Sequence, residues 1–518
     1  MHGRKYLLVG LLLPICWNVT AQKNTPTQKR ASIQKNTSAS ADKAALFDAE
    51  VRAGLKLWQT PGMSIAIVKD GKVVFKKGYG VTELGKTAPF TTSTLSICAS
   101  TTKAMTAVCM AMLVDEGKIK WTDKVSDVYP ALKLYDPYAN SEMTVKDLFT
   151  HNTGLGNADW LWVEGLPLDS IIYKMRLIEP AYSFRSSFIY QNLMYMVAGE
   201  VIHKVSGKPW NEFITERIFT PLGMTHTYPS YSASIQEPSH ITPHFRYGDT
   251  VVKPIRYIEV KNVDAAGAVW SCADDINKWM LCLLDSTRTP GGAKLLKPET
   301  YQLLFTPQSM VTPQEFYPTA RATKPHWTTY GLGWFQEDYH GKMVNFHTGS
   351  LDGAVAICGL INDEHFGIYI FSNLDHTELR HALMYKAMDL WVFNDNGTDW
   401  SDSLHTIYKG LRDSADRREK VFEAKRVLNT RPSLVLAAYS GTYSHPLYGN
   451  AWIRLEGDSL VLSYPNNIRV RLSHWHYDTF LGQFDYEWMG KDWLTFRFNA
   501  EGKVSGFNFL GEEYEKEE

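Results

Sequence analysis

Residues 96–117 read Ser-Ile-Cys-Ala-Ser-Thr-Thr-Lys-Ala-Met-Thr-Ala-Val-Cys-Met-Ala-Met-Leu-Val-Asp-Glu-Gly and predict one helix around which the rest of the chain is organised. Its apolar side chains recur at the spacing of one helical face, namely Met105, Val108, Cys109, Met112 and Leu113. Gly117 follows the last of them, where a glycine commonly ends a helix. A helix with this apolar face is expected to be buried in the centre of a domain.

Ser100 and Lys103 stand at the front of this predicted helix. Their spacing is close to one helical turn, so both side chains leave the same face. A buried, partly neutral amine can take the proton of a hydroxyl, and a helix N-terminus can stabilise a developing anion. The same spacing also occurs at Ser32–Lys35 and Ser40–Lys43, in polar sequence. From this stretch alone, nucleophile and helix N-cap are about equally good interpretations of the serine.

The bulk composition is that of an ordinary globular protein. The chain has 518 residues, of which 44% are hydrophobic and 21% charged, so it is long enough for two or more domains. With 54 basic and 55 acidic residues the net charge is −1. This balance gives no electrostatic basis for binding nucleic acid.

The N-terminus has the pattern of an export signal. Two basic residues precede an apolar run at 6–13, and small residues at 19–21 offer a cleavage site. We therefore predict a signal peptide at 1–21 and a periplasmic or secreted protein. Lipoprotein anchoring at Cys16 is the less favoured alternative, because a bulky isoleucine precedes it. No later segment is apolar enough to cross a membrane, so none is expected in the mature chain.

The cysteines that remain after the signal do not form a disulfide framework or a zinc motif. Their number is odd, none forms a Cys-x-x-Cys pair, and all lie in apolar or small-residue runs. We expect buried free thiols. They are Cys98, Cys109, Cys272, Cys282 and Cys358.

The order of predicted elements favours an α+β domain. Residues 22–44 are polar and predict a flexible tether, and a hairpin with an Asp-Gly turn follows at 63–75. Helical patterns fill the middle of the chain, and successive strands return at 344–372. The first and last strands can then share one antiparallel sheet, in a domain that we place at 45–395.

Beyond that domain the pattern of polar and apolar residues changes. Residues 396–433 are polar and then charged, and predict a helical linker. Residues 434–518 contain short alternating strands separated by glycine turns. This pattern predicts a small all-β barrel.

Two further motifs acquire meaning from their order. Tyr190-Gln-Asn192 precedes a predicted helix, and His347-Thr348-Gly349 lies on a predicted strand, followed by Ser350. Each alone is more often structural than functional. Ser-x-x-Lys, then Tyr-x-Asn, then His-Thr-Gly is, however, the arrangement of serine β-lactamases and penicillin-binding proteins.

With its flanking sequences, the chain resembles the class C β-lactamase-like serine hydrolases, in the branch that contains esterases and D-amino-acid peptidases. The flanks that match are Asp115–Lys118, Thr144–Leu155, Phe184–Tyr195, Pro221–Met224 and Ala265–Gly267. The C-terminal barrel is similar to the lipocalin-like domain of some of these peptidases. The resemblance implies the β-lactamase/DD-peptidase fold, an antiparallel sheet flanked by helices with a helical subdomain.

The resemblance also implies roles for single residues. Ser100 would become acylated, Lys103 would help take its proton, and Tyr190 would relay protons to the leaving group and help activate water. Asn192 would bind the acyl side chain, and backbone N–H groups of Ser100 and Ser350 would form the oxyanion hole. No metal or organic cofactor is implied.

His347 departs from the lysine that penicillin-recognising relatives usually carry. The resemblance places it, with Thr348, Gly349 and Ser350, among the substrate-binding residues. Histidine is only partly charged at neutral pH, which argues against binding a penicillin-like carboxylate.

The leading hypothesis is an exported serine hydrolase that cleaves a peptide, an amide or an ester, and peptides that contain D-amino acids are among the candidate substrates. A β-lactamase or DD-carboxypeptidase is the narrower alternative. A catalytically inactive protein that binds a small molecule or peptide is the alternative from another class. We find no Gly-x-Ser-x-Gly sequence for a general α/β-hydrolase. The sequence does not determine the role of the barrel or the oligomeric state.

Overall fold

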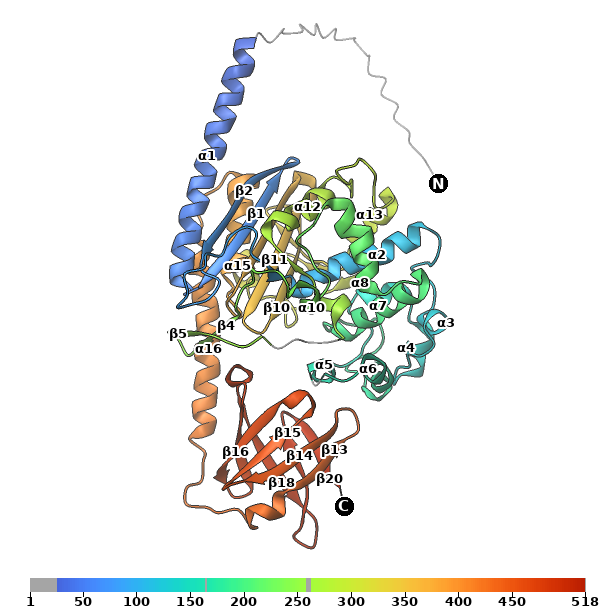
Figure 1. The fold of residues 1–518 in the computed structure, drawn as a ribbon, viewed down its shortest axis with the longest axis vertical. Coiled ribbons are helices and arrows are strands. Elements are labelled where there is room, and N and C mark those ends of the chain that lie inside the picture. Colours follow the sequence, from blue (N-terminus) through green and yellow to red (C-terminus); the bar gives the residue numbers. More distant parts are fainter. Residues whose placement is uncertain (1–25, 164, 258–261, 518) are drawn as a thin grey trace, which may run out of the picture. The chain divides into compact units, whose positions relative to one another are not determined.

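A computed structural model describes residues 26–163, 165–257 and 262–517 of the chain (Figure 1). The described residues divide into two compact units, the first up to Leu46 and the second from Phe47 onward. The predicted signal peptide and Cys16 lie outside the described residues. None of the helices in the described ranges has the length and apolar character that crossing a lipid bilayer requires.

Helix α1 spans Pro26–Leu57 and therefore begins inside the stretch that we assign to a tether. Alanine and lysine, which favour helix, are frequent in this stretch. In the second unit, Phe47, Val51 and Trp58 at the end of this segment are buried. The domain limits derived from the sequence stay predictions.

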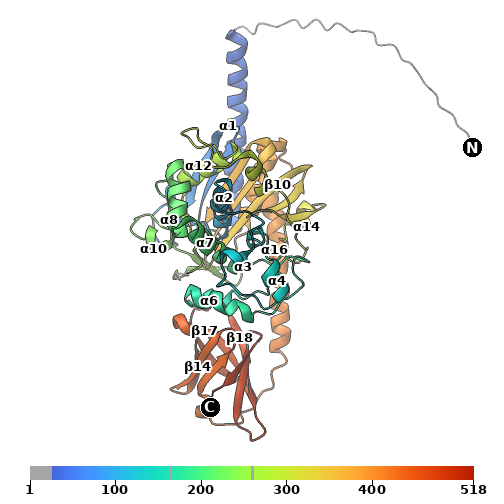
Figure 2. The same ribbon diagram turned by 90° about the vertical axis from the view of Figure 1, so that its right-hand side faces the viewer.

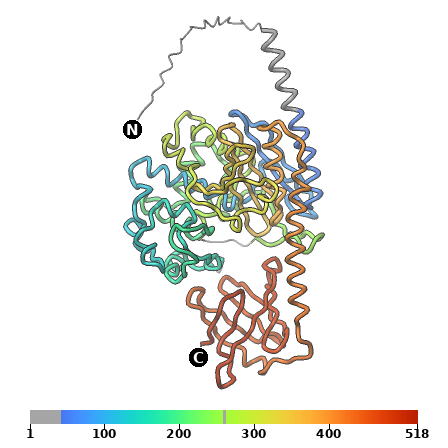
Figure 3. Tube along the Cα trace, turned by 180° about the vertical axis from the view of Figure 1, so that it is seen from behind, coloured from blue at the N-terminus to red at the C-terminus, as the bar shows by residue number. Residues whose placement is uncertain are grey.

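An antiparallel sheet of eight strands forms the core of the large domain. Its order is β2-β1-β12-β11-β10-β9-β8-β7. The strands are β1 (Gly62–Lys69), β2 (Lys72–Gly80), β7 (Ser309–Met310), β8 (Thr328–Tyr330), β9 (Phe335–Tyr339), β10 (Lys342–Leu351), β11 (Ala354–Ile361) and β12 (Phe366–Ser372). Strand β1 pairs with β12, with Ile65 opposite Ile370, which confirms that the first and last strands share one sheet. Figure 3 shows these segments, blue and orange, side by side.

Helices α12 (Ala273–Leu284) and α15 (Leu379–Met388) cover opposite faces of this sheet (Figure 1). Gly359 of β11 faces Met384 of α15, where an added Cβ would lie 2.5 Å from the sulfur. On the other face, Gly367 of β12 lies against Leu284 of α12. Successive residues of a strand point to opposite faces, so the apolar strands β1, β11 and β12 are buried on both.

The stretch at 96–117 forms three elements instead of one helix. They are β3 (Ser96–Ile97), the 3₁₀ turn η1 (Ala99–Thr101) and α2 (Thr102–Asp115). The single-helix prediction was wrong at its start because β3 pairs with the distant strand β6 (Trp270–Ser271). The end was right, since Gly117 has a left-handed φ of 71°. Residues 102–113 are all buried, so α2 is covered on every side.

The middle of the domain is helical, as the sequence predicts (Figure 2). A capping box begins the 3₁₀ turn η2, where the Asp147 carboxylate accepts from the Thr144 N–H, and Gly207 ends α7 with a φ of 74°. The elements are α3 (Val125–Val128), α4 (Pro137–Glu142), η2 (Val145–Phe149), α5 (Trp160–Val163), α6 (Leu168–Lys174), η3 (Met175–Leu177), α7 (Asn192–Ser206), α8 (Trp210–Ile214), η4 (Thr215–Phe219), α9 (Thr220–Leu222) and α10 (Tyr231–Ser234). After them come β4 (His244–Tyr247), β5 (Val251–Pro254), α11 (Asp264–Gly267), α13 (Pro298–Leu304) and α14 (Ala320–Thr323).

Helix α16 (Trp400–Glu423) leads to a closed antiparallel barrel. Its strands are β13 (Gly441–His445), β14 (Gly449–Glu456), β15 (Ser459–Ser463), β16 (Arg469–His476), β17 (Thr479–Phe484), β18 (Lys491–Phe498), β19 (Val504–Phe509) and β20 (Glu512–Lys516). Strand β13 pairs with β20, with Tyr443 opposite Lys516, and this closes the barrel. The structure thus confirms an α+β domain followed by an all-β barrel. It also confirms that the five cysteines of the described chain are buried free thiols.

Candidate active site

Ser100 lies in the turn η1, between β3 and α2, in the centre of the large domain. The residue before it, Ala99, has a φ of +46°, which is uncommon for a residue with a side chain. Thr101 Oγ1 donates to the Cys98 carbonyl at 2.9 Å and so stabilises the turn. Strained backbone of this kind often marks a functional position, and here it directs Ser100 out of the core, where its side chain is only partly buried.

Lys103 brings a fully buried amine to this serine. Its Nζ lies 3.1 Å from Ser100 Oγ, 2.7 Å from Asn192 Oδ1 and 2.8 Å from the carbonyl oxygen of Ala266. The amide oxygen of Asn192 and the carbonyl oxygen of Ala266 can only accept hydrogen bonds. A neutral amine therefore donates its two N–H groups to them, and its lone pair faces the Ser100 hydroxyl.

The surroundings of Lys103 favour that neutral form. The side chain is 0% exposed, and burial lowers its pKa to about 7. The carboxylate of Asp159 acts in the opposite direction and keeps the amine basic. Asp159 also accepts from Asn192 Nδ2 at 3.0 Å, which directs the amide oxygen of Asn192 to Lys103.

Tyr190 packs over the same amine, just before α7. Its ring centroid lies 4.8 Å from Lys103 Nζ and 4.4 Å from the ring of His151, whose Nδ1 accepts from the Gln191 N–H. The hydroxyl is buried and makes no hydrogen bond of normal geometry within the described chain, although Ser100 is near enough to affect its pKa. Burial raises the pKa of Tyr190 well above its usual range, so the phenol is neutral.

His347 is buried inside the domain. Its ring is 1% exposed, its Nδ1–H donates to the Thr348 carbonyl at 2.6 Å, and its Nε2 accepts from the Tyr330 hydroxyl at 3.0 Å. Burial and the nearby Lys103 lower the pKa of His347 to about 3. The imidazole is thus neutral and both of its nitrogens are used internally. Thr348 is also turned inward, toward the Tyr317 hydroxyl at 2.6 Å.

Gly349 and Ser350 of β10 pass directly beside the turn η1. A Cβ added at Gly349 would lie 2.0 Å from the Cys98 carbonyl oxygen and 3.0 Å from the Ala99 side chain. Only glycine permits this approach. It places Ser350 at the same cavity as Ser100.

Gly349→Ala is expected to lower kcat/KM by about 10²-fold, because β10 must move away from η1 and a shift of about 1 Å at a catalytic centre has that effect. Steady-state kinetics on purified, folded protein would measure it. Gly410→Ala is the matched control, since a Cβ there would meet nothing within 4 Å beyond its own helix backbone, and its kinetics should not change. A Gly349→Ala enzyme with unaltered kinetics would contradict this account of the turn.

A cavity of about 350 Å³ opens at Ser100. Of the predicted site residues, Ser100, Asn192 and Ser350 line it. Three aromatic side chains form part of its wall, Trp162, Tyr231 and Tyr257. Its size and mixed lining are typical of a small-molecule or peptide site. Among the described residues, no group of three or more His, Cys, Asp and Glu side chains is arranged to hold a metal ion.

The structure adds residues that sequence reasoning missed. Asp159 and Tyr330 contact Asn192 and His347, and neither lies in a quoted motif that assigns it a role. The carbonyl acceptor for Lys103 belongs to Ala266, inside the Ala265–Gly267 marker. The marker indicated that this segment belongs to the site. It could not indicate the hydrogen bond to Lys103, because any residue type can supply a backbone carbonyl.

The fold and this site define a class of enzyme. Residues 47–390 match the Beta-lactamase family, so the chain belongs to that family of serine hydrolases. Residues 425–517 match a domain of unknown function, DUF3471, which contains the barrel.

Similar proteins include two curated relatives of different origin. Unguisins hydrolase ungD' of Aspergillus campestris is 27% identical over 419 residues, which cover 78% of this chain and 76% of that protein. Protein flp of Staphylococcus aureus is 25% identical over 341 residues, 64% of each chain.

Two solved structures share the fold. The octameric penicillin-binding protein homologue from Pyrococcus abyssi has a TM-score of 0.59 at 21% identity and covers 91% of this chain and 99% of its own. SurE has a TM-score of 0.54 at 17% identity, over 93% of this chain and 100% of its own.

Proposed function

We propose that this hydrolase cleaves a peptide, amide or ester through an acyl-enzyme on Ser100, and that its N-terminal segment directs it to export. The observation that carries the catalytic proposal is the buried Lys103 amine, 3.1 Å from Ser100 Oγ and with a pKa of about 7. A base of that pKa is half neutral at physiological pH, which is the condition for general-base catalysis.

In the acylation step, the Lys103 amine takes the Ser100 proton while Oγ attacks the substrate carbonyl carbon. The resulting oxyanion accepts from the backbone N–H groups of Ser100 and Ser350. The tetrahedral intermediate then breaks its bond to the leaving group. Tyr190 gives its proton to that group and regains one from the Lys103 ammonium. In the second half of the reaction, water gives a proton to Tyr190, which passes its own to the Lys103 amine, and attacks the ester carbonyl carbon. When the bond to Oγ breaks, Lys103 returns a proton to Ser100 and the enzyme is restored.

The electrostatics support different residues as the acid and the base. The pKa of Tyr190 is raised and that of Lys103 is lowered, so at neutral pH the phenol retains its proton while the amine can release one. Two titratable groups with pKa values displaced in opposite directions are typical of an acid–base pair. Among the described residues the Tyr190 hydroxyl has no partner of normal hydrogen-bond geometry, so its proton is available to a leaving group at Ser100.

The cavity favours a substrate whose acyl portion is neutral. His347 occupies the usual place of a lysine but is neutral and buried, so this position offers no cation to a β-lactam or C-terminal carboxylate. The aromatic wall suits apolar side chains. Unguisins hydrolase, a relative of similar length, is by name a hydrolase of unguisins. We therefore favour amides and esters that lack a carboxylate beside the bond that is cleaved.

Intact-protein mass spectrometry tests the acyl-enzyme. The purified protein is mixed separately with a fluorophosphonate, an activated ester and a penicillin, with Ser100→Ala as the control. We expect adducts with the first two reagents that map to Ser100 and are absent from the control, and little or none with penicillin. Folded protein that no reagent labels would favour the inactive binding protein instead.

The pH dependence follows from the lowered pKa of Lys103. Only the neutral amine is a base, so kcat/KM is expected to fall about tenfold per pH unit below 7 and to reach a plateau above about 8. Because the pKa of Tyr190 is raised, its ionisation should not reduce the rate within the plateau. Ester hydrolysis from pH 5.5 to 9, with circular dichroism to show that the fold persists, measures this. If kcat/KM still rose at pH 9, a Lys103 amine with a pKa of about 7 would be excluded as the general base.

A further inference from the structure

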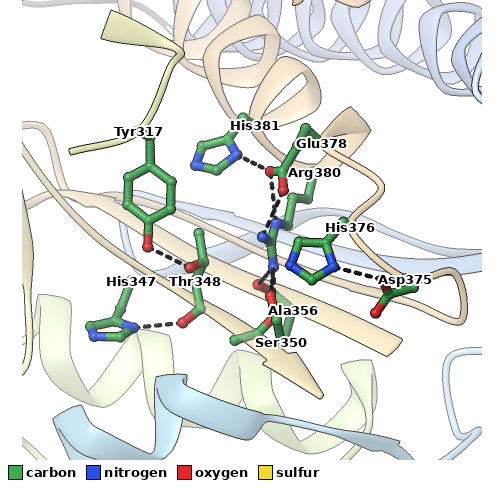
Figure 4. A network of polar contacts seen from close by, with 11 residues as sticks. Tyr317, His347, Thr348, Ser350, Ala356, Asp375, His376, Glu378, Arg380 and His381 are labelled. Carbon is green, nitrogen blue, oxygen red and sulfur yellow. Dashed lines mark hydrogen bonds and ion pairs between the residues drawn. The ribbon is translucent and has the colours of Figure 1, made fainter. Parts of the chain in front are cut away.

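A buried ion pair lies behind β10, beside the cavity. Glu378 and Arg380, at the start of α15, are 5% and 2% exposed, and His381 is 0% exposed. Figure 4 shows Arg380 between Glu378 and the β10 segment at Ser350. Burying charges costs free energy that an ion pair does not always recover, so a pair of this kind is weak evidence for stability alone.

All three nitrogens of the guanidinium donate hydrogen bonds. Its Nε and Nη2 donate to the two carboxylate oxygens of Glu378 at 3.1 and 3.0 Å. Its Nη1 donates to the Gly349 carbonyl at 2.6 Å, to Ser350 Oγ at 2.9 Å and to the Ala356 carbonyl on β11 at 3.2 Å. His381 Nδ1 donates to the same carboxylate at 2.6 Å. Glu378 therefore fixes the plane of the guanidinium, and the guanidinium holds β10.

The shortest of these contacts acts on one particular peptide group. The Gly349 carbonyl and the Ser350 N–H belong to the same planar, trans peptide unit, so they point in opposite directions. When Arg380 fixes the carbonyl, it also fixes the direction of the N–H. A charge-assisted bond to the carbonyl also polarises the amide and strengthens its N–H as a donor.

The Ser350 hydroxyl is oriented by the same cation. A guanidinium only donates, so Ser350 Oγ must accept from Arg380 and its own proton points elsewhere. Ser350 lines the cavity, so that proton is available to an oxygen atom of a bound substrate. One buried cation thus orients both the N–H and the hydroxyl of Ser350.

We propose that Arg380, held by Glu378, is a positioning residue that aligns the Gly349–Ser350 peptide as one donor of the oxyanion hole. The inference rests on the proposed acyl-enzyme function. It predicts that Arg380 affects the transition state much more than the binding of substrate, because the oxyanion exists only after attack.

Arg380→Lys tests this, because lysine keeps the charge but loses the planar fork. We expect kcat for an activated ester to fall about 10²–10³-fold, as when one oxyanion donor is lost, with KM within about twofold of wild type. Affinity for a boronic acid, whose tetrahedral adduct on Ser100 places an oxygen in the hole, should fall in parallel. Arg246→Lys is the control, a half-buried arginine that donates to the Trp58 carbonyl, and its kinetics should stay unchanged.

A second variant covers the case in which Arg380→Lys does not fold. Arg380→Met with Glu378→Gln removes both charges together and avoids an unpaired buried carboxylate. It should show the same loss of kcat and boronate affinity at nearly constant KM. Rates are expressed per folded site, counted by fluorophosphonate labelling carried to completion.

The outcomes separate this inference from the function on which it rests. Folded variants that lose melting temperature but retain kcat and boronate affinity would mean that the ion pair only stabilises the fold, while the acyl-enzyme proposal would stand. A wild-type protein that never labels at Ser100 would overturn both. Loss of boronate affinity with constant KM supports the positioning role.

Discussion

Ser100→Ala is expected to lower kcat about 10⁶-fold, the effect of removing the nucleophile from a serine hydrolase whose residues act as a unit. Without Oγ, the hydroxyl that would form the acyl bond is missing, and the Lys103 amine has no proton to take from it. Hydrolysis of an activated ester by wild-type and variant protein, at matched concentration, measures the loss. The variant should also give no adduct with a fluorophosphonate.

The same substitution should leave the fold intact. Ser100 is partly exposed, and its hydroxyl is one of three hydrogen-bond partners of the Lys103 amine, which keeps Asn192 and the Ala266 carbonyl. We therefore expect a melting temperature close to that of wild type. Ser64→Ala is the matched control, because it removes a hydroxyl that is buried and unpaired within the described chain, and its activity should persist. Substantial turnover by Ser100→Ala would show that another residue is the nucleophile.

Much of this fold could be predicted because its signals are local. A hairpin turn, a glycine C-cap such as Gly207 and an apolar helix face each depend on a few neighbouring residues. The start of α2 could not be predicted in this way. Ser96 and Ile97 become a strand only because they pair with Trp270 and Ser271, far away in the sequence.

In the candidate site, too, local contacts could be predicted and contacts between distant segments could not. Ser100 and Lys103 lie within one turn of backbone, so their contact could be anticipated from spacing. The contacts that set their chemistry come from loops and strands distant in sequence, such as Asp159 on Asn192 and Arg380 on Gly349. His347 shows the limit of a motif, since its position on a strand was predictable but the burial that makes it neutral was not.

Lys103→Met is expected to slow acylation of Ser100 about 10²–10⁴-fold, the usual contribution of a general base. Methionine fills a similar volume, but it cannot take the proton and leaves the Ala266 carbonyl without its donor. The rise of kcat/KM through pH 7 should disappear with the amine. Lys386→Met is the matched control, because Lys386 is 4% exposed and donates to the carbonyl of Thr398 at 2.9 Å, and its loss should leave the pH profile unchanged.

A second substitution at the same residue distinguishes a lost base from a distorted site. Lys103→Ala removes the amine and leaves space, so a small primary amine in the buffer can occupy the position and take the proton of Ser100. The rate of Lys103→Ala should then increase with methylamine concentration and with pH, whereas Lys103→Met, whose side chain fills the space, should not respond. Equal responses of the two variants would mean that the added amine acts elsewhere. If both variants acylated at the wild-type rate, Lys103 would not be the base, and the neutral amine beside Ser100 would need another explanation.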